Sequence, residues 1–314
     1  MNTPILQVSN LRKTYGRIQA VRDVSFDIAA GEIFGLLGPN GAGKSTTINI
    51  VSTLLAADAG RVVLCGDATL SPVEQRRRIG YVPQEISLAE RMTARENLRL
   101  VGRLYDLSGR ALRARVDEIL TAVGLNDRGD DIVGTFSGGM KRRLNIAAAL
   151  LHDPKLVLLD EPTAGVDPQS RAYIFEIVER LAGEGRAVLY TTHYMEEAQR
   201  LCRRIAIVDH GQILAIGTLA ELVQRVGAGR ELVIEAPGLS ASAAAALAAR
   251  LGVVPAACAV QNGGARVSLG AAGCTMMTAV RAADELGLQA TSIRMHEPTL
   301  ETVFLALTGH ALRD

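Results

Sequence analysis

Apolar and polar positions in the first part of the chain follow the spacing of strands. Three short β-prone segments, residues 5–11, 20–28 and 32–38, are separated by glycine turns. This pattern predicts two hairpin strands followed by a buried strand that leads into a glycine-rich loop. A helix is expected to begin near Lys44, directly after that loop.

Between residues 85 and 150 the apolar spacing changes to the period of a helix. Thr93 and Glu96 form a capping-box pattern at the start of one helical stretch, which closes at Gly124. Another helix is expected after Ser137 and is stopped before Pro154. These features predict a helical insert at about residues 85–150.

Strands and helices alternate after the insert. The run "LVLLD" at residues 156–160 is typical of a buried parallel strand. Asp167 and Pro168 have the residue types of a helix N-cap and first turn, and "AVLYTTH" at 187–193 predicts the next strand. The alternation predicts an α/β fold with a parallel sheet, to which the first segments add an antiparallel β subdomain.

The composition changes after residues 227–230, a glycine-containing stretch that we interpret as a hinge. A chain of 314 residues is long enough for two domains, and we place them at residues 1–227 and 228–314. The second domain is expected to be a small α+β domain. It offers no phosphate loop or nucleophile set, so we expect it to regulate or stabilise assembly without taking part in catalysis.

Charge and cysteine content exclude several classes of protein. Lys and Arg number 34 against 33 Asp and Glu, so no overall field favours nucleic acid. The basic runs at residues 76–78 and 141–143 are interpreted as solvated helix faces. The four cysteines form no C-x-x-C pair, and the N-terminal residues have no signal-peptide pattern, so we expect a protein that stays inside the cell. The Ala-rich run at 241–260 contains Arg250, which favours a helix followed by a strand over a membrane span.

A phosphate-binding loop follows the third predicted strand. Its glycines allow successive backbone N–H groups to converge on phosphate oxygens, and the following helix adds its dipole. The lysine reaches the β and γ phosphates, and the serine that follows it can bind Mg²⁺. The loop "GPNGAGKST" consists of Gly38, Pro39, Asn40, Gly41, Ala42, Gly43, Lys44, Ser45 and Thr46.

Two further features suit phosphate chemistry. Ser137, Gly138 and Gly139 open a helix and form a second candidate anion site. Asp160 and Glu161 end the apolar strand, and strand alternation is expected to direct one towards a metal ion and the other towards an attacking water.

Three single residues are ambiguous by themselves. Gln84 and His193 stand at the ends of predicted elements, where a polar residue usually forms hydrogen bonds with its neighbours and has no further function. Tyr15 has the residue type of a packing side chain, and it is also suited to stacking on a nucleotide base. These alternatives stay open on the residues alone.

Taken in order over about the first 220 residues, these motifs resemble those of the ATP-binding subunits of ABC transporters. The resemblance implies an adenine-stacking Tyr15, the Walker A loop at residues 38–46 and a glutamine loop at Gln84. It also implies a signature at residues 137–140, a Walker B pair at Asp160 and Glu161, a following loop at Asp167 and a switch histidine at His193. The chain departs from the family pattern at Met140, where glutamine is usual, and at Arg203, where many relatives have aspartate.

The resemblance also implies the chemistry. It assigns ATP as the ligand of Tyr15, Gln84, the Walker A loop and Ser137 to Gly139, with Lys44, Glu161 and His193 as catalytic residues. Mg²⁺ would be held by Ser45, Gln84 and Asp160. Two subunits would dimerise head to tail, so that the signature of one closes over the ATP bound by the other.

The tail "EPTLETVFLALTG" at residues 297–309, with "YTTHYMEEAQRLC" at 190–202, resembles ATP-binding subunits of drug-export (ABC-2) systems. The implied protein is an ATPase that is peripheral on the cytoplasmic face of the membrane and drives a separate permease, in the direction of export. An importer subunit, a soluble ABC ATPase of DNA repair or translation, and a nucleotide-gated module without turnover are the alternatives.

Overall fold

The computed structural model describes residues 4–237, 239–253, 258–261, 264–268 and 274–309, which form two compact units. The first unit extends to Thr218 and the second begins at Leu219. This division precedes the boundary predicted near residue 228. The reason is that helix α8 (Leu219–Val226) packs against α11 (Leu300–Thr308), which lies in the second unit.

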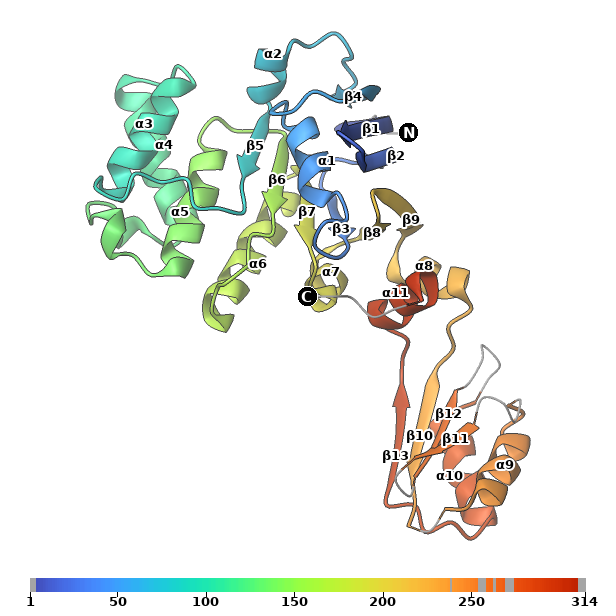
Figure 1. Ribbon diagram of the computed structural model, residues 1–314. Coiled ribbons are helices and arrows are strands. Elements are labelled where there is room, and N and C mark those ends of the chain that lie inside the picture. Colours follow the sequence, from blue (N-terminus) through green and yellow to red (C-terminus); the bar gives the residue numbers. More distant parts are fainter. Residues whose placement is uncertain (1–3, 238, 254–257, 262–263, 269–273, 310–314) are drawn as a thin grey trace. The chain divides into compact units, whose positions relative to one another are not determined.

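A six-stranded sheet forms the centre of the first unit, in the order β5-β6-β7-β3-β8-β9 (Figure 1). Neighbouring strands are parallel except for β9, which is antiparallel to β8. Strands β6 and β7 are buried along their whole length, as their apolar runs predict. The strands are β3 (Ile33–Leu37), β5 (Ile79–Val82), β6 (Leu156–Asp160), β7 (Ala187–Thr192), β8 (Arg204–Asp209) and β9 (Gln212–Gly217).

The antiparallel subdomain contains the predicted hairpin. Strand β1 (Leu6–Tyr15) pairs with β2 (Ile18–Ile28) on one side and β4 (Ala59–Leu64) on the other. Its inward residues join one hydrophobic core with β3 and α1 (Lys44–Val51). Phe26 and Phe34 stack within this core with ring centroids 5.1 Å apart, which fixes the hairpin beside the strand that leads to the phosphate loop.

The predicted insert is helical and lies beside β5, at the edge of the sheet (Figure 1). It contains α3 (Ala94–Leu104), α4 (Gly109–Ala122) and α5 (Gly138–Leu150), with short 3₁₀ turns at Asn126–Arg128 and Val133–Thr135. The capping box of Thr93 and Glu96 is confirmed at the start of α3. The other helices of this unit are α2 (Pro72–Arg76), α6 (Pro168–Gly183) and α7 (Met195–Leu201).

One interpretation of the sequence is wrong. The basic run at residues 141–143 is not a solvated helix face, because Arg142 is only 4% exposed and Lys141 and Arg143 are partly buried. Lys141 pairs with Glu90, and the Arg143 guanidinium donates to the carbonyl of Val123 and covers the ring of Tyr173. The run lies where α5 meets the end of α4 and Tyr173 of α6, so a backbone carbonyl and an aromatic ring contact the Arg143 guanidinium in place of water.

Besides α8 and α11, the second unit contains an antiparallel sheet in the order β11-β12-β10-β13 and the helices α9 and α10. The Ala-rich run forms a helix followed by a strand, as expected. Within the described ranges, no helix is both long and apolar enough to cross a bilayer. The elements are β10 (Glu231–Glu235), α9 (Ala241–Arg250), β11 (Cys258–Gln261), β12 (Gly264–Ser268), α10 (Met276–Glu285) and β13 (Ser292–His296).

Candidate functional site

The phosphate loop joins β3 to α1 in the way that the sequence predicts. Gly41 and Gly43 have φ angles of 80° and 98°, which only glycine adopts without strain. A side chain at Gly43 would also place its Cβ 2.3 Å from the carbonyl oxygen of Ala20. Helix α1 begins directly after this turn, so its free N–H groups face the loop.

Lys44 lies under the loop and is 4% exposed. Its Nζ donates to the carbonyls of Gly38 at 2.8 Å and Pro39 at 3.1 Å, and lies 3.3 Å from Oε1 of Glu161. Burial lowers the pKa of Lys44, while the charges of Glu161 and Asp160 oppose the shift. The lysine is therefore held in place before any phosphate is bound.

Glu161 is the point at which three predicted residues meet. Its Oε2 lies 3.1 Å from Nδ1 of His193 and 3.5 Å from Nε2 of Gln84, and its Oε1 faces Lys44. Glu161 is the first residue after β6 and has a φ angle of 45°. The direction of the Glu161 side chain relative to that of Asp160 is therefore set by a left-handed turn and not by the alternation of side chains along a strand.

Asp160 ends β6 and is 3% exposed. Burial raises the pKa of its carboxyl group, while hydrogen bonds from the side chains of Thr191 and Ser45 act in the opposite direction. Ser45 and Asp160, two of the three predicted Mg²⁺ ligands, are therefore in contact. The third, Gln84, contacts Glu161.

The second cradle lies at the N-terminus of α5. Ser137 is the N-cap and its hydroxyl accepts from the backbone N–H of Met140 at 3.2 Å. Ser137 and Gly138 are exposed, while a Cβ on Gly139 would lie 2.0 Å from Oγ of Ser170. The cradle therefore packs against the start of α6, where Asp167 is the N-cap.

These residues form two separate groups. Within the described residues, no hydrogen bond or ion pair joins Ser137, Gly138 or Gly139 to Lys44 or Glu161. Tyr15 is separate from both groups, 48% exposed at the end of β1, with Nζ of Lys13 5.8 Å from its ring centroid. A single chain thus presents one lysine-containing cradle and one exposed serine–glycine cradle.

Comparison with known proteins shows the family of the chain. The family described as "ABC transporter" matches residues 21–164. The linearmycin resistance ATP-binding protein LnrL of Bacillus subtilis (strain 168) is 42% identical over 99% of this chain and 100% of its own length. The chain belongs to the ABC transporter family. Nod factor export ATP-binding protein I of Ralstonia nicotianae is 38% identical, over 100% of this chain and 96% of its own.

The fold of this ABC transporter protein is shared with solved cassettes. A dimeric ATP-binding cassette in a post-hydrolysis state, bound to ADP and phosphate, matches with a TM-score of 0.62 and 30% identity. The match covers 68% of this chain and 98% of that one. The predicted fold class and the assignment as the ATP-hydrolysing subunit of a transporter are confirmed, and the relatives are of the export type.

Sequence reasoning missed Thr191, which connects the Walker B residues of this ABC protein. Its buried hydroxyl donates to Oδ1 of Asp160 at 2.6 Å and accepts from the backbone N–H of Glu161 at 3.0 Å. One side chain on β7 therefore fixes both the carboxylate and the turn that follows it. The available signal was the presence of hydroxyl residues in an otherwise apolar buried strand.

Glu197 was also missed. It is 2% exposed, and its carboxylate accepts hydrogen bonds from the hydroxyls of Thr163, Tyr190 and Thr192. Two of these donors precede His193 on β7, and Thr163 follows the Walker B pair. Because the carboxylate is fully satisfied, it holds the strand end and α7 in one position on both sides of the histidine.

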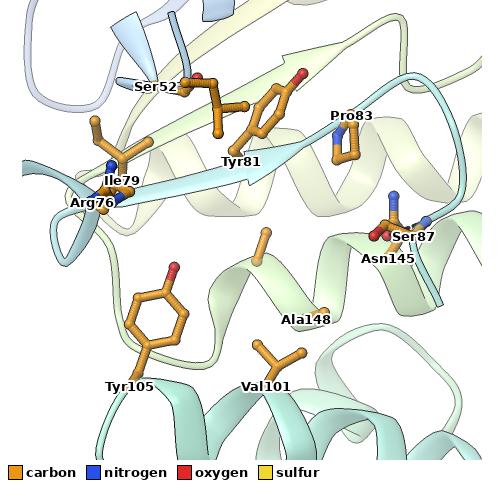
Figure 2. A pocket seen from close by; sticks show the side chains of 12 residues that line it. Ser52, Arg76, Ile79, Tyr81, Pro83, Ser87, Val101, Tyr105, Asn145 and Ala148 are labelled. Carbon is orange, nitrogen blue, oxygen red and sulfur yellow. Dashed lines mark hydrogen bonds between the residues drawn. The ribbon is translucent and has the colours of Figure 1, made fainter. Parts of the chain in front are cut away.

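A cavity of about 370 Å³ lies next to the glutamine loop. Figure 2 shows Val101 from α3, Tyr105 directly after that helix and Tyr81 from β5 around it, with Asn145 on α5. Asn145 is 4% exposed, and its Nδ2 has no hydrogen-bond partner. Pro83 and Ser87, on either side of Gln84, complete one wall.

Proposed function

We propose that two copies of this chain form a head-to-tail dimer around ATP and Mg²⁺, and that hydrolysis drives a separate membrane permease in the direction of export. The observation that carries this proposal is the convergence of Lys44, Gln84 and His193 on Glu161. A buried carboxylate surrounded by donors and beside a phosphate loop is suited to act as a general base.

Each residue has a separate task. Lys44 stabilises the charge that develops on the β and γ phosphates. Glu161 accepts the proton of the attacking water, and His193, 3.1 Å from Oε2, orients that carboxylate. Backbone N–H groups at the start of α1 hold the phosphates, and Tyr15 is exposed at the end of β1, where it can stack on the base.

The residues present fit Mg²⁺. Ser45 and Asp160 provide a hydroxyl and a carboxylate that already meet, and Gln84 brings an amide oxygen to the same neighbourhood. Mg²⁺ prefers such oxygen ligands and is commonly held by one or two carboxylates together with phosphates. A cation would also offset the burial of the Asp160 carboxylate. When bound, Mg²⁺ would neutralise phosphate charge; Ser45, Asp160 and Gln84 would hold it.

The dimer follows from the separation of the two cradles. Ser137 and Gly138 are exposed and make no contact with Lys44 in their own chain, yet a capped helix N-terminus is a good phosphate site. A second copy can therefore place this cradle over the bound nucleotide. Each charge-assisted hydrogen bond across the interface would contribute about 1.5–3 kcal/mol, so a few are enough to favour closure while the γ-phosphate remains.

Mixing two variants tests this arrangement. Lys44→Ala and Ser137→Arg subunits should each fail to form an ATP-dependent dimer alone, but a mixed dimer has one site with an intact Lys44 and an intact Ser137. Recovery of nucleotide-dependent dimerisation in the mixture supports action between subunits. No recovery, despite mixed dimers captured by cross-linking, would show that Ser137 serves the phosphate of its own chain.

We propose that the permease docks at the cavity beside the glutamine loop. Three features support this: the Nδ2 of Asn145, which has no hydrogen-bond partner, the apolar lining from Val101 and Tyr105, and the wall formed by the loop that carries Gln84. A permease segment bound there would contact the loop that carries Gln84, so its binding would depend on the position of that loop. The proposal also places the protein at the cytoplasmic face of the membrane through its partner.

Filling the cavity tests the docking proposal. Val101→Trp should abolish co-purification with the permease from detergent extract, while ATP binding by the separate subunit is retained. Arg103→Trp is the matched control, because Arg103 lies on the same helix, is exposed and does not line the cavity. Equal co-purification of both variants with the permease would place the partner elsewhere.

A further inference from the structure

Arg142 connects the helix that carries the signature to the loop that carries Gln84. Its two terminal guanidinium nitrogens donate to the carbonyls of Pro83 at 2.8 Å and Gln84 at 2.5 Å. Arg142 is 4% exposed, and burial lowers the pKa of the guanidinium, partly opposed by the charge of Asp160. The side chain is therefore a buried cation that is bonded to backbone and not to a carboxylate.

A second residue on the same face of α5 holds the other end of this loop. Asn145, three residues after Arg142, accepts from the backbone N–H of Ser87 at 3.4 Å. The segment of residues 83–87, which we name the Gln84 segment, is thus attached to α5 at both ends. Its Gln84 side chain is exposed and reaches Glu161 at 3.5 Å, so the attachment to α5 determines where that amide lies.

The chemistry of the contact requires arginine. The carbonyls of two consecutive residues are matched by the planar fork of a guanidinium, which donates to both at once. A lysine at position 142 keeps the charge but has a single ammonium on a flexible stem, so it cannot hold both carbonyls in one geometry.

We propose that Arg142 is a positioning residue that fixes Gln84 relative to Glu161 and the Mg²⁺ ligands, and thereby couples the signature helix α5 to the catalytic centre. This inference rests on the proposed role of Gln84. It assigns a function to Arg142 in the basic run at residues 141–143, which follows the signature and lies outside the phosphate loop.

The test compares Arg142→Lys with a matched control, Arg143→Lys. Arg143 is the next residue of α5, but its guanidinium binds the carbonyls of Val123 and Gly124, away from the Gln84 segment. The first readout is hydrogen exchange of the Ser87 amide, which donates to Asn145, in the nucleotide-free protein. Arg142→Lys should make this amide exchange about tenfold faster, equivalent to about 1.4 kcal/mol of local stability, and Arg143→Lys should not.

The second readout is the Mg²⁺ concentration that gives half-maximal ATP hydrolysis. Loss of a residue that orients a ligand typically costs roughly 10- to 100-fold in metal affinity, so Arg142→Lys should raise this concentration by such a factor. Gln84→Ala should raise it as well, and the double variant should be no worse than Gln84→Ala alone, because Arg142 acts through Gln84.

The outcomes separate the two proposals. If Gln84→Ala leaves the Mg²⁺ dependence unchanged, the proposed role of Gln84 fails and Arg142 positions no metal ligand. If Gln84→Ala changes that dependence but Arg142→Lys changes neither it nor the exchange of the Ser87 amide, the positioning role is overturned. Equal effects of Arg142→Lys and Arg143→Lys would also overturn it, since they would reflect a general loosening of α5. Melting temperatures identify variants that fail to fold, and Arg142→Gln then replaces Arg142→Lys.

Discussion

Glu161→Gln removes one negative charge and almost no volume from the centre of the site. In the free protein Glu161 faces Lys44 at 3.3 Å, and both side chains are nearly inaccessible to water. In the proposed mechanism the γ-phosphate of ATP replaces this carboxylate as the partner of Lys44. The substitution therefore removes the proposed general base and, at the same time, a competitor for the lysine.

The substitution has two expected effects, a loss of turnover and a loss of stability. A general base contributes about 10²–10⁴-fold, so turnover should fall by that factor, which corresponds to about 2.7–5.4 kcal/mol in activation free energy. Breaking a buried ion pair typically costs about 3–5 kcal/mol in stability. Lys44 keeps the carbonyls of Gly38 and Pro39, so we expect a smaller loss of about 1–2 kcal/mol for the nucleotide-free variant.

Three measurements check this reasoning. Phosphate release gives the loss of turnover, thermal unfolding with and without ATP gives the change in stability, and size-exclusion chromatography detects ATP-trapped dimers. The variant should melt lower than wild type without ATP and gain more from ATP. Glu90→Gln, which removes an exposed charge, is the control and should keep wild-type turnover. Turnover of Glu161→Gln within tenfold of wild type, or loss of ATP binding, would refute the reasoning.

Four further outcomes are expected. Lys44→Ala should abolish turnover, because a charge on the β and γ phosphates is lost; wild-type turnover in the purified variant would remove the phosphate-loop assignment. Thr191→Val should destabilise the fold by about 2–4 kcal/mol in urea denaturation, since a bond to Asp160 is lost and a buried N–H is left unpaired, whereas Thr191→Ser should cost less than half of that. Burial lowers the pKa of His152 below its ordinary 6.5. As the pH drops through 6.5, the unfolded chain therefore binds a proton before the folded chain does, and the free energy of unfolding falls. His152→Phe should lose this dependence when the free energies of unfolding at pH 7.5 and 5.5 are compared. A chain ended after Thr218 should still bind ATP in equilibrium titrations; failure in a folded truncation would show that the second unit contributes to the site.

The sequence by itself determined the features that depend on neighbouring residues. The glycines of the phosphate loop, the capping box at Thr93 and the apolar run of β6 are local, because backbone freedom, capping and strand burial are properties of a short segment. The boundary predicted near residue 228 differs from the division between the two units, which follows Thr218. The division depends on the packing of α8 against α11, and a change in composition along the chain does not predict that packing.

Only the tertiary structure decided which side chains meet. Gln84 and His193 reach Glu161 from 77 and 32 residues away, because the sheet brings the ends of β5, β6 and β7 to one edge. The direction of Glu161 depends on a left-handed turn, which strand periodicity does not predict. Arg142 has the residue type of a solvated charge, and it is buried because the Gln84 segment offers it two carbonyls. A sequence pattern reports whether a residue tolerates water, whereas its partners are set by contacts between segments that are distant along the chain.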